Sequence, residues 1–147
     1  MLLLNFLILC SHAYAPKSLS WTKNPSIFIC KESKVKVEDV KAAAKFWQNK
    51  GHQFGEIKHV EDCDKFRYGY IIFIGDENLD SRYAGMTEVF EYGDRITSAY
   101  IEIWDSNSRN LKVITHELGH AIGYDHVDNI YNIMYSAPPD AKVTIRR

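Results

Sequence analysis

Residues 116–126 read HELGHAIGYDH, and no other stretch constrains the fold of this chain as strongly. On an α-helix a step of four residues returns to within about 40° of the same face, so His116 and His120 point in one direction. Gly123 can adopt the left-handed conformation that ends a helix, which brings His126 back as a third ligand. Three imidazoles leave one position of a tetrahedral zinc ion open, as in a catalytic site.

Glu117 lies about 100° around the helix from His116, near the metal but not directed at it. A carboxylate in this position suits a general base that acts on zinc-bound water. The alternative is a helix that carries two buried histidines on one face without a metal. We disfavour it because the glycine and the third histidine stand at the offsets that a three-histidine site requires.

The same stretch resembles the metzincin zinc peptidases, whose motif is H-E-x-x-H-x-x-G-x-x-H followed by a methionine-containing turn, the Met-turn. The sequence NIMY follows at 132–135, and the distance of eight residues from His126 to Met134 is similar to the matrixin branch. The resemblance implies a zinc endopeptidase with Glu117 as general base and Met134 as support below the metal. It implies one catalytic zinc with three ligands: His116, His120 and His126.

The apolar pattern predicts one domain with a mixed, α+β fold. Apolar residues recur at helical spacing over 37–47, and Gly51 ends that helix. A second helix, which carries the histidines, is expected to begin near Arg109, with Ser106, Asn107 and Ser108 as candidate caps. Strands are expected at 25–30, 54–60, 69–74, 83–90 and 96–104, the third of them central and covered on both faces. The metzincin resemblance covers about 25–136 and implies a twisted, mixed five-stranded sheet with the two main helices packed against it.

In that family an extended peptide pairs antiparallel with the edge strand of the sheet, above the zinc. We place this edge strand at 84–90. Its assigned substrate-binding residues are Ala84, Gly85, Met86 and Thr87. The implied partner is therefore an extended peptide or protein substrate.

Three features depart from the matrixin pattern. The second, structural zinc of matrixins uses several histidines ahead of the active-site helix, and this chain has none between His59 and His116, so we expect no second zinc. The selectivity pocket of matrixins has a proline and then a tyrosine after the Met-turn, whereas SAPP follows Tyr135 here. Residues 140–147 are too short and basic to predict the C-terminal helix of the family.

The first 15 residues read MLLLNFLILCSHAYA, a short apolar run that ends in an A-x-A site. This pattern predicts a secretory signal peptide at 1–15 and a secreted, matrixin-like catalytic domain at 16–147, without a pro-segment or a C-terminal accessory domain. The run is too short to span a bilayer, so we expect no membrane anchor. In an oxidising compartment Cys30 and Cys63 are candidates for a disulfide, with two buried free thiols as the alternative.

Charge gives little information about partners. Lys+Arg 18 against Asp+Glu 19 leaves a net charge of −1, which offers no argument for binding nucleic acid or anionic membrane, and we expect a monomer. The loop at 75–80, GDENLD, carries three carboxylates. A calcium site there is the less favoured alternative to a solvated acidic loop.

The leading hypothesis is a secreted zinc endopeptidase that hydrolyses internal peptide bonds. The alternative is a weakly active or inactive zinc-binding interaction protein that uses the metal as a fold staple. The altered pocket wall and the trimmed C-terminal region favour this alternative, whereas Glu117 argues against it, because a staple does not need a general base. An aminopeptidase or other amide hydrolase is a second rival.

Overall fold

A computed structural model describes residues 19–77, 80, 82–136 and 142–146, the last range by its backbone. The signal peptide predicted at 1–15 lies outside the described residues, as do the two prolines that follow Ser136. No helix in the described part of the chain has the length and apolar character that crossing a membrane requires.

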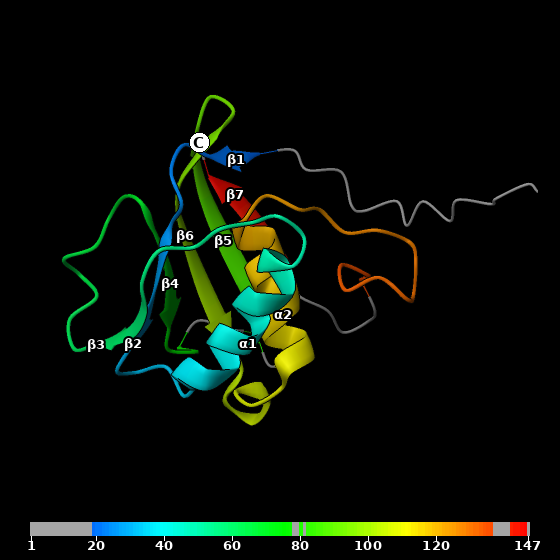
Figure 1. Ribbon diagram of the computed structural model, residues 1–147. Coiled ribbons are helices and arrows are strands. Elements are labelled where there is room, and N and C mark those ends of the chain that lie inside the picture. The colour runs from blue at the N-terminus through cyan, green and yellow to red at the C-terminus, as the bar shows by residue number, and fades with distance from the viewer. Residues whose placement is uncertain (1–18, 78–79, 81, 137–141, 147) are drawn as a thin grey trace, which may run out of the picture.

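The fold is mixed α/β, with two α-helices packed on one face of a sheet (Figure 1). The described strands form one seven-stranded sheet in the order β3-β2-β4-β6-β5-β7, and β1 pairs with β6 outside this order. The strands are β1 (Ser20–Trp21), β2 (Ser26–Cys30), β3 (Ile57–Val60), β4 (Tyr70–Ile74), β5 (Gly85–Tyr92), β6 (Arg95–Ile103) and β7 (Lys142–Arg146). The helices are α1 (Val37–Gln48), the short 3-10 helix η1 (Asp105–Asn107) and α2 (Leu111–Ala121).

Strand β4 lies at the centre of the sheet, parallel to β2 on one side and to β6 on the other. Ile71, Ile72 and Phe73 of this strand are fully buried. This confirms the prediction of a central strand covered on both faces, because a strand with one solvated face would alternate between apolar and polar residues.

Helix α1 buries the face that its apolar spacing predicts, with Val40, Ala43, Ala44 and Trp47 in the core. Its partner is α2, since the Trp47 indole Nε1 donates a hydrogen bond of 2.9 Å to the Thr115 carbonyl. The indole has one N–H donor, so this bond allows a large aromatic side chain to be buried without an unsatisfied polar group.

Helix α2 begins at Leu111, two residues after the predicted start. Its cap is Asn110, whose side-chain oxygen accepts hydrogen bonds from the backbone N–H groups of Lys112 and Val113. The predicted capping residues at 106–108 were wrong. They lie in and just after η1, which turns the chain between β6 and α2 before the longer helix starts.

The number of strands was also wrong, because β1 and β7 add to the five that were predicted. Strand β7 pairs parallel with β5 from Met86↔Lys142 to Phe90↔Arg146. The sequence of β7, KVTIR, has three consecutive β-branched residues, a composition that favours a strand. The predicted edge strand at 84–90 is therefore not a free edge over Met86–Phe90.

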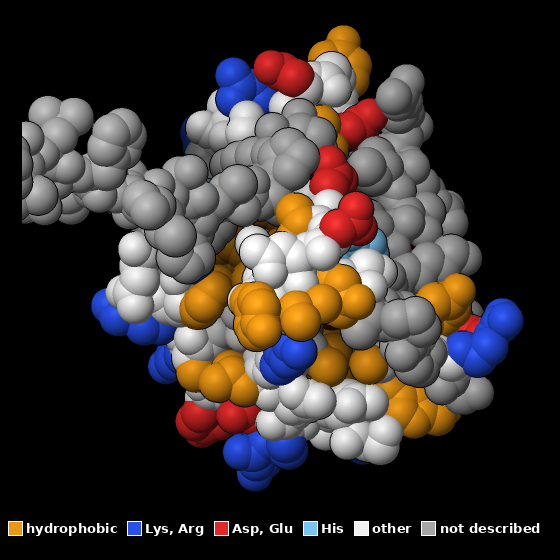
Figure 2. Space-filling view, turned by 90° about the vertical axis from the view of Figure 1, so that its right-hand side faces the viewer, with side chains coloured by type: hydrophobic (Ala, Val, Ile, Leu, Met, Phe, Trp, Pro, Cys, Tyr) orange, Lys and Arg blue, Asp and Glu red, His pale blue; other side chains and the backbone are white. Residues whose placement is uncertain are grey.

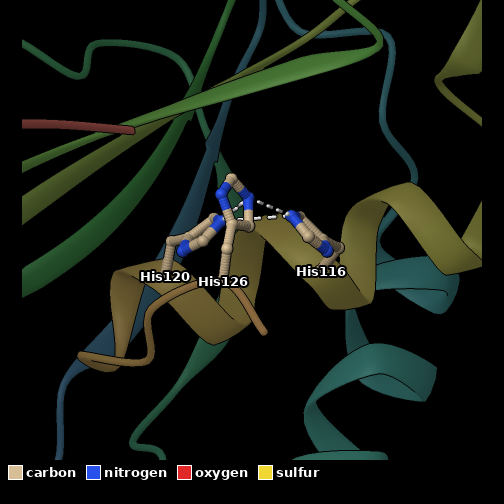
Figure 3. Close-up of side chains that lie close together, drawn as sticks. All are labelled: His116, His120 and His126. Carbon is tan, nitrogen blue, oxygen red and sulfur yellow. Dashed lines mark hydrogen bonds between the residues drawn. The ribbon is translucent and has the colours of Figure 1, made fainter. Parts of the chain in front are cut away.

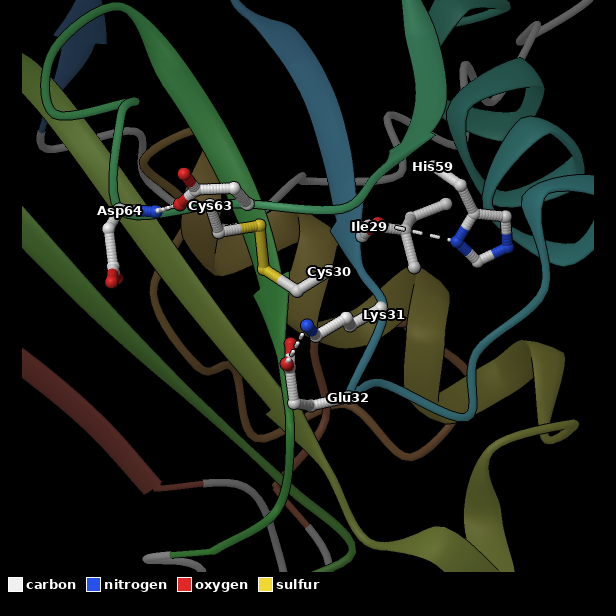
Figure 4. The surroundings of a disulfide bond; sticks show 8 residues. Ile29, Cys30, Lys31, Glu32, His59, Cys63 and Asp64 are labelled. Carbon is white, nitrogen blue, oxygen red and sulfur yellow. Dashed lines mark hydrogen bonds and ion pairs between the residues drawn. A yellow bond between two sulfur atoms is a disulfide. The ribbon is translucent and has the colours of Figure 1, made fainter.

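A disulfide joins Cys30, at the end of β2, to Cys63, in the turn that precedes β4 (Figure 4). The Cα atoms are 5.8 Å apart, within the usual range for a disulfide. The predicted pairing of these two cysteines is confirmed. The bond fixes the connection between β3 and β4 to the strand that both flank in the sheet.

Replacing both cysteines by alanine should lower the free energy of unfolding by about 3–4 kcal/mol, the loop-closure value for a sequence separation of 33. Urea denaturation of the parent and of the double variant measures this loss. The parent in reducing agent is the control and should match the variant. Two titratable thiols in the unreduced, denatured parent would contradict the assignment.

Candidate metal centre

Gly123 turns the chain back toward α2, as the sequence predicts. Its φ is +101°, a conformation that residues with a side chain rarely adopt. A Cβ at this position would also overlap the Leu19 carbonyl, so glycine is required both by conformation and by space. The turn places His126 beside the two histidines of α2.

The three histidine rings point toward one another (Figure 3). The Nε2 atom of His120 is 3.0 Å from Nε2 of His116 and 3.0 Å from Nε2 of His126, and the third side of the triangle is 3.1 Å. Zn–N bonds of about 2.0–2.1 Å in tetrahedral geometry place two nitrogens about 3.3 Å apart. The nitrogens thus lie within a few tenths of an ångström of the separation that one metal ion requires.

Backbone carbonyls decide which nitrogens can bind a metal. His116 Nδ1 lies 2.7 Å from the Ile133 carbonyl oxygen, and His120 Nδ1 lies 2.7 Å from the Tyr124 carbonyl oxygen. A carbonyl can only accept, so Nδ1 carries the proton in both rings and Nε2 carries a lone pair. Two lone pairs 3.0 Å apart repel each other, and a cation between them converts this repulsion into ligation. The donor set therefore fits a metal ion.

Burial keeps the two helical histidines neutral. His116 is 8% exposed and His120 is 1% exposed. Loss of hydration disfavours the charged imidazolium, and it lowers the pKa of His116 to about 4 and that of His120 to about 3. Both imidazoles are thus in the metal-binding form at neutral pH, without a proton to displace.

The segment predicted as a Met-turn packs against α2 and contacts one histidine of the cluster. Met134 is 1% exposed and packs against α2 at Gly119, where a Cβ would overlap the Met134 sulfur. This turn pairs with the segment that follows α2, because the Val127 N–H donates a hydrogen bond of 3.0 Å to the Met134 carbonyl. The carbonyl of Ile133 within it orients His116. The turn thus acts on one histidine through a backbone hydrogen bond and on the helix through a buried side chain.

Glu117 is fully buried between α2 and β5. A Cβ on Gly85 would lie 2.8 Å from Glu117 Cγ, and Thr87 Oγ1 lies 2.6 Å from Glu117 Oε2. Two of the four residues assigned to substrate binding therefore contact the candidate general base. The other two have backbone partners: Ala84 O accepts from Trp104 N, and Met86 pairs with Glu102 and Lys142.

Tyr124 is a site residue that the sequence prediction missed. Its carbonyl orients His120, its ring stacks on Trp47 at a centroid distance of 4.9 Å, and its hydroxyl lies 2.8 Å from His52 Nε2. The sequence feature that could have identified Tyr124 is its place inside the motif, between Gly123 and His126. The chain must reverse there, so a backbone carbonyl at this point faces the helix end.

Among the residues that the structure describes, the three histidines form the one cluster able to hold a metal ion. In the acidic loop, Asp76 accepts a hydrogen bond from Asp105 N–H at 3.1 Å, and Asp80 pairs with Arg82 at 2.7 Å. The expectations on calcium and on a second zinc stay predictions.

Hydrophobic side chains gather on the face that carries the segment after α2 (Figure 2). Tyr131 is 91% exposed and Ile130 is 59% exposed. These residues and Ile133 line a pocket of about 360 Å³ together with Phe46 and Lys112. Because the Ile133 carbonyl also binds His116, the pocket shares a residue with the support of the metal cluster.

Comparison with protein-family models finds no match to this chain, and a search of curated proteins finds no significant match. The site itself is therefore the basis for assigning a function, because a fold alone does not determine one.

The protein should bind one zinc ion per chain, measured by metal analysis after dialysis. His126→Ala should weaken zinc binding by more than the 10- to about 100-fold typical of losing an outer hydrogen bond, because it removes a ligand. This histidine is half-buried, so its loss is less damaging to the fold than that of His120. His59→Ala, on β3 and outside the cluster, is the control. Equal zinc affinity in parent and His126→Ala would contradict the site.

Proposed function

We propose that this chain is a secreted, zinc-dependent endopeptidase of the metzincin type, similar to matrixins, that hydrolyses internal bonds of extended peptides or proteins. The observation that carries the proposal is the convergence of three histidine Nε2 atoms, with the buried Glu117 next to the first of these histidines in the helix. A three-histidine site leaves a metal position open for reaction, and a neighbouring carboxylate is the group that peptide hydrolysis needs for proton transfer.

In this proposal, the three histidines bind the metal and Glu117 transfers protons. His116, His120 and His126 would hold the zinc, which would supply a Lewis acid for the scissile carbonyl and for water. Glu117 accepts a proton from the attacking water and delivers it to the leaving amine, so that the amine departs as a neutral group. The Ile133 and Tyr124 carbonyls keep His116 and His120 in the tautomer that binds metal.

The substrate binds along the outer edge of β5. That edge offers backbone N–H and C=O groups to an extended peptide. Strand β7 occupies the same edge over Met86–Phe90. A long substrate therefore competes with β7 for the same backbone groups.

Secretion rests on two features of different kinds. The apolar run at 1–15 ends in an A-x-A site, and the Cys30–Cys63 disulfide is compatible with an oxidising compartment.

The second candidate is an interaction protein that keeps zinc as a fold staple. Strand β7 favours it, because an edge that is already paired is not open to a peptide. The candidate does not account for the contacts that β5 makes with Glu117, since a staple gains nothing from a positioned carboxylate.

Glu117→Gln tests the general base. The side chain keeps its size and the three ligands are untouched, but the carboxylate that accepts a proton is lost. Zinc content should stay at one per chain, while hydrolysis of a quenched internal peptide should fall by about 10²- to 10⁴-fold.

Glu38→Gln, the same chemical change at an exposed position of α1, is the matched control and should retain full activity. Cleavage by Glu117→Gln at the parent rate would show that Glu117 is not the base. If the zinc-loaded parent cleaves nothing in a broad peptide mixture, the staple candidate is correct.

Removal of residues 137–147 tests competition by β7. The truncated chain should show a several-fold lower KM for peptides long enough to pair along β5, because apparent affinity rises with the fraction of molecules whose edge is free. A short peptide that does not reach Met86–Phe90 is the control and should show an unchanged KM. An equal or higher KM for the long peptide would exclude competition.

A further inference from the structure

Thr87 and Glu117 contact each other in the buried space between β5 and α2, and both are fully buried. The Thr87 hydroxyl oxygen lies 2.6 Å from Glu117 Oε2 and 3.1 Å from the Glu117 backbone carbonyl oxygen. A hydroxyl has one proton to donate. The shorter distance is that of a charge-assisted O–H···O⁻ bond, so Thr87 donates to the carboxylate.

Gly85 forms the second contact between β5 and this carboxylate. It stands two residues before Thr87 and therefore on the same face of the strand. A Cβ there would lie 2.9 Å from Glu117 Oε1 and 3.0 Å from Cδ, closer than side chains normally approach. The strand thus presents a flat backbone surface at Gly85 and a hydrogen-bond donor at Thr87. Both features act on the same carboxylate.

We propose that Thr87 is a positioning residue that holds the Glu117 carboxylate in its working orientation through the hydrogen bond from Oγ1 to Oε2. The inference rests on the proposed role of Glu117 as general base. A general base transfers protons efficiently only within hydrogen-bond reach and in a defined orientation. A displacement of about 1 Å at such a group can cost a factor of about 10² in rate.

The hydroxyl, and not the volume of the side chain, carries this role. Val is nearly isosteric with Thr and also favours strands, so Thr87→Val removes the donor and leaves the packing of β5 in place. Thr87→Ser keeps the hydroxyl and removes the methyl group. The matched control is Thr97→Val on β6. It removes a threonine hydroxyl that donates a hydrogen bond of 3.1 Å to the Phe90 carbonyl.

Thr87→Val should lower kcat about 10- to 100-fold, with KM within about twofold of the parent and one zinc per chain. Thr87→Ser should keep kcat within about threefold, and Thr97→Val should match the parent. In the Glu117→Gln background, Thr87→Val should leave the residual rate unchanged, because the group that it positions is already lost. A parent-like kcat in Thr87→Val, or an equal loss in Thr97→Val, would overturn the proposal.

A second measurement does not depend on activity. The crystal structure of metal-free Thr87→Val should show the Glu117 carboxylate rotated away from Gly85 or in several conformers, while Thr87→Ser keeps the single parent position. An unmoved carboxylate in Thr87→Val would overturn the positioning role. If the parent proves inactive while the carboxylate moves as expected, the proposed function fails and the structural role of Thr87 stands.

Discussion

Two hydrogen bonds from histidine side chains to the backbone determine whether the histidine cluster can bind a metal ion. His116 and His120 donate their Nδ1–H groups to the carbonyls of Ile133 and Tyr124, which leaves both Nε2 lone pairs directed at one point. Both carbonyls lie beyond the end of α2, so the helix alone cannot fix the tautomers. Both tautomers are fixed only when the turn at Gly123 and the segment that contains Ile133 are folded. Metal binding is thereby coupled to folding of the segment after the helix.

Strand β5 connects the sheet to the candidate site. It is held antiparallel to β6, and its inner face meets α2 through Gly85 and Thr87, both in contact with Glu117. A shift of one residue in this register would turn Thr87 away from the helix and present Met86 to the carboxylate. The pairing of β5 with β6 therefore determines the environment of Glu117. The same strand register therefore fixes both the sheet pairing and the orientation of the Glu117 carboxylate.

Residue spacing in the sequence predicted those parts of the candidate site that lie within one helix or one turn. The spacing of His116 and His120, the turn at Gly123 and the buried face of α1 follow from helix geometry, and they are found as predicted. The contact between Thr87 and Glu117 depends on how β5 lies against α2, which no spacing in the sequence states. The start of α2 was misplaced because several residues near Asn110 can cap a helix, and η1 decides between them.

Strand β7 could not be predicted either, because a segment of five residues becomes a strand only when an edge is available to pair with it. An unpaired edge over Met86–Phe90 would expose a row of N–H and C=O groups, which is a template for aggregation. Under the proposed function, an extended substrate would need the same groups. Pairing with β7 and the proposed pairing with a peptide thus use the same backbone N–H and C=O groups of β5. The histidine cluster and the contacts of Glu117 come from α2, the segment after it and the inner face of β5. Under the proposed function, β7 would therefore affect substrate binding without altering the proposed catalytic groups.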